Sequence, residues 1–324
     1  MASRRIGKVT YKNDLSPQLT VFRLEPETGS SFPTYQAGQY IALGRDDARL
    51  MKKAGFDRDG RSSFVPDIDA RGEQRLGPVI HSYSVASAPW ETVERGFLEF
   101  YVAQEVSNGR PGRLSTVLLG MECCVGEPVN YVDRITGSFT LDKLVDRATR
   151  IIMVGTGTGL APFVSMIKQL HHAGGDGRTY TLLHTNRTSA ELGYHQTLLD
   201  VEASGSFDFL HIPTISRPIE QDIDQRVGSG RATNVLRLLY GLPMRKVEDS
   251  RKAPAGSSER AEAEATLART PRPTLPATID PTAVRDRVEP GGDAVMLVCG
   301  NPASTTDIQR TAGRVGVRVE AEVW

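Results

Sequence analysis

The sequence has 324 residues, which predicts two domains of ordinary size, and 39 Lys and Arg residues balance 39 Asp and Glu residues. This balance excludes the strongly basic field of a nucleic-acid-binding protein and the acidic bias of a solvating tail. No apolar run is long enough for a membrane span, and the start "MASRRIGKVTYKND" lacks the apolar core of a signal peptide. Because Cys123, Cys124 and Cys299 form no CxxC pair, we expect no disulfide framework and no metal site. We therefore expect the protein to be located in the reducing cytoplasm.

The first half of the sequence has the pattern of short antiparallel strands. In "GFLEFYVAQ", Leu98, Phe100 and Val102 alternate with Glu99 and Tyr101, which predicts a half-buried strand. We expect a small barrel or sandwich over residues 1–145, with a flexible, charged and Gly-rich insertion at about 45–78. The other predicted strands, separated by Gly, Pro and Asp breaks, are "LTVFRLEP", "GQYIALG", "HSYSVASAP" and "EPVNYVD".

The second half, over residues 146–324, has the pattern of an α/β domain with a parallel sheet. The apolar run "RIIMV" precedes a glycine turn and a helix, in which Pro162 suits the first turn and Gly174 can end the helix. Further apolar strands are "TYTLLHT", "FDFLHIPTIS" and "AVMLVCG". Residues 246–290 are rich in Pro, Ala and charge, so we expect a flexible insertion in which "SSERAEAEATLAR" could hold a helix.

Three alternating glycines mark the turn in "IIMVGTGTGLAPF". Gly155, Gly157 and Gly159 lie between a buried strand and the start of a helix, where the backbone can approach a pyrophosphate closely. Leu160 stands where the usual GxGxxG pattern needs glycine, and no GK[ST] follows, so neither common nucleotide motif is complete. The alternative interpretation is a tight strand–helix turn without a ligand.

Arginines follow the next elements along the chain. Arg187 lies in "TNRTS", Arg217 in "TISRP" and Arg231 in "GSGRATNVL". Arginine near these strand ends favours a 2′-phosphate, whereas an acidic residue would favour the free ribose hydroxyls of NAD. The alternative is that each arginine is a solvated surface charge.

The segment "HSYSVASAP" is a further candidate. An exposed Tyr83 could stack on a flat ring, and the hydroxyl of Ser84 could bond a ring nitrogen, although Tyr–Ser pairs are also common in strands.

In chain order, the motifs "QAGQY", "SYS", G-x-x-S, "GTGTGLAPF", "CGNP" and a terminal aromatic resemble the ferredoxin–NADP⁺ reductase family. The resemblance covers nearly the whole chain apart from the two insertions. It implies an N-terminal antiparallel FAD barrel and a C-terminal NADP domain. It also implies hydride exchange between NADPH and flavin N5, followed by single-electron exchange with ferredoxin or flavodoxin.

The resemblance also assigns roles to matching positions. It implies that Tyr83 stacks on the flavin, that Ser84 bonds the flavin N5, and that Cys299 faces the nicotinamide. Glu322 matches the family's acidic residue near the end, and Trp324 its terminal aromatic over the other flavin face. The implied FAD-binding set is His81, Ser82, Tyr83, Ser84, Gly112, Arg113, Leu114, Ser115 and Trp324. The implied NADP-binding set is Gly155, Thr156, Gly157, Thr158, Gly159, Arg187, Ser216, Arg217, Arg231, Cys299, Gly300 and Pro302.

One position departs from the family pattern. His81 stands where the family has an arginine that neutralises the flavin pyrophosphate, and histidine is mostly neutral at pH 7. We expect Arg113, within the G-x-x-S element, to supply this charge instead.

Two other functions fit the same motifs. One is a reductase component of an oxygenase, or a free-flavin reductase, of the same superfamily. The other is a non-catalytic, regulatory or partner-docking protein that keeps the flavin fold. Flavin content and a preference for NADPH over NADH discriminate among them.

Overall fold

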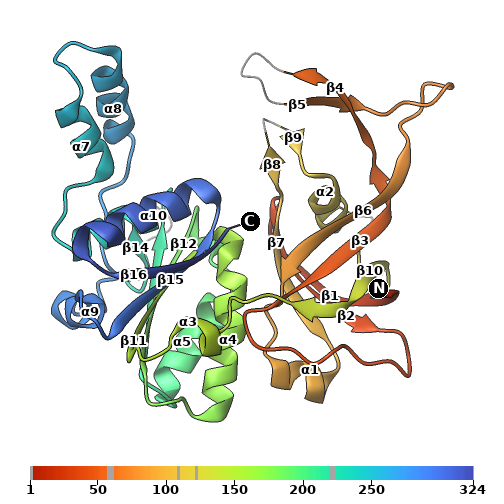
Figure 1. Ribbon diagram of the computed structural model, residues 1–324, viewed down its shortest axis with the longest axis horizontal. Coiled ribbons are helices and arrows are strands. Elements are labelled where there is room, and N and C mark those ends of the chain that lie inside the picture. Colours follow the sequence, from red (N-terminus) through yellow and green to blue (C-terminus); the bar gives the residue numbers. More distant parts are fainter. Residues whose placement is uncertain (1–2, 57–61, 108–109, 121–122, 219–223, 324) are drawn as a thin grey trace. The chain divides into compact units, whose positions relative to one another are not determined.

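The chain divides into two compact units, Met1–Gly137 and Ser138–Trp324. The computed structural model describes residues 3–323 apart from 57–61, 108–109, 121–122 and 219–223. Each unit is built on one large sheet, antiparallel in the first and parallel in the second (Figure 1). The predicted fold class is therefore confirmed.

Six antiparallel strands form the main sheet of the first unit, in the order β6-β3-β10-β1-β2-β7. The outer strands β6 and β7 also contact each other, which rolls the sheet into a barrel. Phe22, Leu43, Phe100 and Tyr131 fill its core. The strands are β1 (Arg4–Ser16), β2 (Leu19–Pro26), β3 (Tyr40–Arg49), β6 (Leu76–Ser84), β7 (Leu98–Ala103) and β10 (Pro128–Thr136), with α1 (Pro89–Arg95) before β7.

Helix α2 (Arg113–Leu119) packs against β3, β6 and β7 and buries Leu114, Val117 and Leu118. The short pair β8 (Val106–Ser107) and β9 (Arg110–Pro111) precedes it. At the C-terminal end of α2, the ammonium of Lys12 donates to the carbonyls of Leu119 and Gly120 at 3.2 and 3.0 Å. A cation there satisfies carbonyls that the helix leaves open and opposes the negative end of its dipole, so Lys12 holds α2 against the barrel.

The prediction that β7 is half-buried is wrong. Leu98, Phe100 and Val102 are buried as predicted, but Glu99 and Tyr101 are buried as well, with 2% and 3% of their surface exposed. On this second face of β7, the carboxylate of Glu99 pairs with Arg23 of β2 at 2.8 Å. A buried carboxylate is tolerated when it has such a partner.

The second unit contains a six-stranded parallel sheet in the order β14-β13-β12-β11-β15-β16. Its central strands are continuous apolar runs because both faces of the sheet are covered. The strands are β11 (Arg150–Thr156), β12 (Thr179–Asn186), β13 (Phe209–Ile215), β14 (Gly228–Ser229), β15 (Ala294–Gly300) and β16 (Arg318–Val323).

Helices cover this sheet on both faces. Helices α4 (Ala161–Ala173) and α5 (His195–Ser204) follow β11 and β12, whereas α6 (Ala232–Leu239), α9 (Pro281–Val288) and α10 (Pro302–Val315) share one apolar cluster. Right-handed crossovers place these two groups on opposite faces. In α4, Pro162 lies in the first turn and Gly174 caps the end with φ 75°, both as predicted. Short helical turns are α3 (Leu141–Leu144), η1 (Gly157–Leu160) and η2 (Ser189–Glu191).

Both stretches with the composition of flexible insertions contain regular elements. In the first, β4 (Met51–Phe56) pairs with β5 (Ser62–Pro66). In the second, α7 (Arg245–Lys252) packs against α8 (Ser258–Ala268), which confirms the helix expected in "SSERAEAEATLAR". Glu248 of α7 pairs with both Arg237 and Arg314, so ion pairs fix this insertion where apolar burial is scarce.

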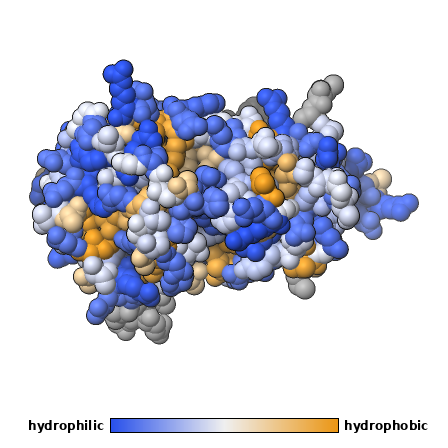
Figure 2. Space-filling model, turned by 90° about the horizontal axis from the view of Figure 1, so that it is seen from below, coloured by the Kyte–Doolittle hydropathy of each residue, from blue (hydrophilic) through white to orange (hydrophobic). Residues whose placement is uncertain are grey.

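The surface view in Figure 2 shows a face that is mostly hydrophilic, with apolar residues gathered in small patches. Among the helices that the structure describes, none combines the length and the apolar character that a membrane crossing requires.

Three histidines cluster under α5 in the second unit. The rings of His184 and His211, on β12 and β13, stack with centroids 5.9 Å apart, and His195 of α5 lies 5.5 Å from His211. Their ring nitrogens are buried and have no hydrogen-bond partner among the described residues. Burial lowers the pKa of His184 to about 3 and the pKa of His211 well below its usual range, and the neighbouring histidines add to both effects.

These depressed pKa values predict loss of stability in acid. Above pH 6.5 the unfolded and folded histidines are all neutral, whereas below it the unfolded chain binds protons that the folded His184 and His211 do not. The double variant His184→Phe/His211→Phe keeps stacked rings without titrating. Between pH 6 and pH 5 it should lose about 2 kcal/mol less unfolding free energy than the wild type. Urea denaturation at both pH values measures the difference.

The control variant is His171→Phe, because the ring of His171 is exposed and bonds Ser206. It should retain the wild-type pH dependence. An equal acid sensitivity of the double variant and the wild type would contradict the prediction.

Candidate functional site

The glycine turn after β11 lies directly against the end of β15. A Cβ atom on Gly159 would lie 2.2 Å from the carbonyl oxygen of Cys299, and one on Gly155 would lie 3.2 Å from the Cα of Leu160. Gly157 has a φ of 57°, which favours glycine. Gly155 and Gly159 therefore let the turn pack closely on the protein's own backbone, whereas an added Cβ atom on Gly157 would meet nothing within 4 Å. Thr156 and Thr158 stand between these glycines.

The "CGNP" segment forms the other side of this cradle. A Cβ atom on Gly300 would lie 2.0 Å from the Oγ1 of Thr156, and that buried hydroxyl has no hydrogen-bond partner among the described residues. Asn301 caps α10 by accepting a hydrogen bond from the backbone N–H of Ser304, and Pro302 occupies the first turn. The structure thus brings the predicted glycine loop together with Cys299, Gly300 and Pro302.

Glu322 lies next to Cys299 in the register of β15 and β16. Its Oε2 is buried and without a partner in the described part of the chain, and burial raises the pKa of the carboxyl to about 7. A carboxyl group in this state can hold a proton at neutral pH. Trp324, the other candidate at this end of the chain, lies outside the described residues.

The predicted phosphate-binding arginines differ in whether they form an ion pair. Arg187 is paired with buried Glu191 through both its Nε, at 2.7 Å, and its Nη2. Arg217 and Arg231 are exposed, and neither forms an ion pair with a described residue. Sequence reasoning missed Glu191, although its position four residues after Arg187 is the usual spacing of a local ion pair.

Backbone hydrogen bonds join these arginines at one edge of the sheet. The N–H of Arg217 donates to the carbonyl of Arg187 at 2.8 Å, and the N–H of Ser216 donates to Asn186 at 2.9 Å. Because parallel strands end at the same edge of a sheet, Arg187, Ser216 and Arg217 lie together there.

In the first unit, the "HSYS" segment lies at the end of β6. His81 and Ser82 are exposed, Tyr83 packs partly against the barrel core, and Ser84 is only 9% exposed. Burial raises the pKa of the Tyr83 phenol, and the charge of Glu105 adds to this effect. The Oγ of Ser84 is buried with no hydrogen-bond partner among the described residues, which is the state expected of a group that bonds a ligand.

The second predicted flavin element, "GRPGRLS", reaches Gly112 directly before α2. Its Ser115 hydroxyl donates to the Gly112 carbonyl and accepts from the backbone N–H of Glu105 at 3.1 Å, so it shapes the turn. A Cβ atom on Gly112 would lie 2.7 Å from a carboxylate oxygen of Glu105. Arg113 is exposed, whereas the side chain of Leu114 is fully buried in the barrel core and leaves only its backbone for a ligand. Since α2 packs beside β6, the structure brings both flavin elements together.

Residues 153–234 match the family model described as the oxidoreductase NAD-binding domain. A flavodoxin/ferredoxin–NADP reductase from Rhodobacter capsulatus is 28% identical over 44% of this chain, and the chain spans less than half, 47%, of that relative. The fold also matches two solved structures over 99–100% of the chain. One is the flavohem-like FAD/NAD-binding domain of a Vibrio cholerae nitric oxide dioxygenase (17% identity, 98% of that chain, TM-score 0.60). The other is a Neisseria gonorrhoeae ferredoxin NADP⁺ reductase with bound FAD and NADP (18% identity, 99% of that chain, TM-score 0.57).

The contact between Gly159 and Cys299 predicts the effect of a single methyl group. Gly159→Ala forces the backbone of Cys299 to shift, and overpacking of this kind costs about 1–3 kcal/mol. We expect a lower melting temperature by differential scanning calorimetry. The control is Gly313→Ala, at an exposed position of α10 with open space around the added methyl group, where alanine should be neutral or slightly stabilising. Equal melting temperatures for the two variants would contradict the prediction.

Proposed function

We propose a function for this chain from the premise that it is a relative of the ferredoxin–NADP reductases, with an oxidoreductase NAD-binding domain over residues 153–234. The proposed activity is hydride exchange between NADPH and bound FAD, coupled to single-electron exchange with ferredoxin or flavodoxin in the cytoplasm. The observation that carries it is the buried hydroxyl of Ser84, beside Tyr83, which has no hydrogen-bond partner among the described residues.

The first unit would hold FAD. Tyr83 offers its ring for stacking, the Ser84 hydroxyl is available to N5, and the backbone from Gly112 to Ser115 would face the pyrophosphate with Arg113. His81 and Ser82 are exposed on the same strand and could contact the ligand. When bound, the flavin would supply the ability to accept a hydride and to release its electrons singly.

The second unit would hold NADPH. The cradle of Gly155–Gly159 and Gly300 would face the pyrophosphate at Gly157, where nothing lies within 4 Å of an added Cβ atom. We propose that Cys299 contacts the nicotinamide and that Glu322 holds a proton at its buried Oε2, since its pKa of about 7 lies at the working pH. Trp324 remains the proposed cover of the flavin.

A second candidate is a reductase component that feeds an oxygenase or a haem domain. The similarity in fold to the flavohem-like domain of the Vibrio cholerae dioxygenase favours it. The two candidates share the FAD and coenzyme chemistry and differ in the electron acceptor. Reduction rates with ferredoxin, flavodoxin and a haem domain therefore decide between them.

The first test is the flavin itself. The purified protein should be yellow and should release FAD on heating, as identified by chromatography. Ser84→Ala should slow flavin reduction by NADPH by about tenfold in stopped-flow measurements, because a hydrogen bond to the reacting ring is lost. Ser31→Ala is the control, since Ser31 is an exposed serine of the same unit outside the proposed flavin-binding set. Recovery of FMN alone, or of no flavin, would overturn the proposal.

The second test concerns the coenzyme. Arg217→Ala should reduce the preference for NADPH over NADH by about tenfold or more, because it removes a charge-assisted bond to the 2′-phosphate. Arg187→Ala should instead lower the melting temperature and leave the preference nearly unchanged, since it strands the buried Glu191 carboxylate. Michaelis constants for both coenzymes measure the preference. A loss of preference only in Arg187→Ala would reverse these roles.

A further inference from the structure

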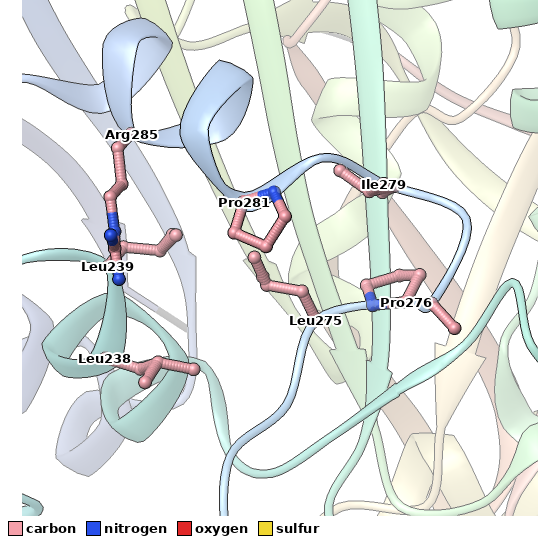
Figure 3. Close-up of a pocket in the computed structure, with 8 residues that line it drawn as sticks. Leu238, Leu239, Leu275, Pro276, Ile279, Pro281 and Arg285 are labelled. Atoms are coloured by element: carbon pink, nitrogen blue, oxygen red, sulfur yellow. The ribbon is translucent and has the colours of Figure 1, made fainter.

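Residues 271–280, which we call the strap, connect the α7–α8 insertion to α9. Leu275 and Ile279 pack against the apolar cluster of the second unit, and Pro276 is buried. Figure 3 shows Leu275, Pro276 and Ile279 beside α6 and α9, around a cavity of about 360 Å³. The strap is therefore held by the domain core, although its composition alone favours a flexible segment.

The strap also pairs with the β14 segment. Thr274 and Ser229 form an antiparallel bridge, in which the N–H of Thr274 donates to the Ser229 carbonyl at 2.9 Å. The N–H of Ala277 donates to the carbonyl of Gln225 at 2.8 Å. A Cβ atom on Gly230 would lie 3.0 Å from the Cα of Pro273. This close approach fixes the strap next to the turn that leads into Arg231.

The pairing brings three arginines to one edge of the sheet. Arg272 is two residues from Thr274, and Arg231 is two residues from its partner Ser229. The turn before Arg231 is also hydrogen-bonded to β13, since the N–H of Gly230 donates to the carbonyl of Ile215 at 2.8 Å. Ile215 lies two residues before Arg217. Arg217, Arg231 and Arg272 thus come from three neighbouring segments.

Charge distinguishes these arginines from their neighbours. Arg226, on the same stretch, is paired with Asp224, whereas Arg217, Arg231 and Arg272 are exposed and form no ion pair within the described part of the chain. Pro271 and Pro273 flank Arg272 and restrict its backbone, so little backbone entropy is lost when Arg272 binds a ligand. Three exposed like charges held together favour an anion with several negative oxygens.

We propose that the strap supplies Arg272 as a third cation for the 2′-phosphate of NADPH, together with Arg217 and Arg231. The inference rests on the proposed function and adds to it a specificity residue that lies in the second insertion, outside the motifs that carry the family resemblance. It gives the insertion a role in coenzyme selection.

The test is binding of 2′,5′-ADP and of 5′-ADP to the full-length protein, with its flavin bound, by isothermal titration calorimetry. Arg272→Ala should raise the dissociation constant for 2′,5′-ADP about tenfold and leave that for 5′-ADP unchanged. Arg272→Lys should restore part of the loss because it keeps the charge. Arg285→Ala is the matched control, an exposed arginine that lines the apolar cavity (Figure 3) and should have no effect.

The outcomes separate the two levels of the proposal. If the wild type prefers 2′,5′-ADP and Arg217→Ala removes the preference while Arg272→Ala keeps it, the role of the strap is overturned and the coenzyme assignment stands. If the wild type binds both nucleotides equally, the proposed NADPH preference fails, and the role of Arg272 fails with it. A melting temperature equal to that of the wild type shows that the Arg272→Ala variant keeps the strap folded.

Discussion

The close approach between the turn after β11 and the end of β15 governs the architecture of the second unit. Gly159 has backbone rather than space where its side chain would be, and Gly300 has the hydroxyl of Thr156 in the same position. Because β11 and β15 are neighbours in the sheet, these two contacts make their carboxyl ends one surface. The backbone of the turn after β11 and the backbone at the end of β15 therefore restrict each other, and neither can change its path alone.

In this unit, some charged groups form ion pairs within the fold, whereas others are available to bind a ligand. Arg187 and Arg237 each stand beside a carboxylate, and their charges are used within the fold. Desolvating a charge is costly, and an opposite charge nearby offsets that cost. A cation that remains exposed without such a partner is the one that can meet a ligand. Sequence position alone does not separate these classes, since Arg187 and Arg217 both follow a strand.

Elements whose own residues determine them could be predicted from the sequence. The apolar run "AVMLVCG" matches β15 residue for residue, and Gly174 ends α4 in the left-handed conformation that glycine favours. The positions of the glycine turn, between β11 and α4, and of the "HSYS" segment, at the end of β6, were likewise predicted, whereas their ligand-binding roles stay predictions.

Features that depend on distant partners could not be predicted. The burial of Glu99 requires Arg23 on another strand, and the attachment of α7 requires Arg314 on α10, far along the chain. The cluster of His184, His195 and His211 is assembled from two strands and a helix, so no local pattern marks it. The local ion pair of the Arg187 guanidinium was not predicted, because a ligand was expected at that position.

The strap has a consequence for how this sheet meets other molecules. β14 is one of the two edge strands of the sheet, and an edge strand presents open N–H and C=O groups on which another chain can add by β-pairing. Thr274 occupies these groups at Ser229, and the prolines on either side of it offer no N–H of their own to extend the pairing outwards. The second insertion thus occupies this margin of the sheet at Ser229. In a shortened chain without residues 271–280, the N–H and the carbonyl of Ser229 would lose these partners.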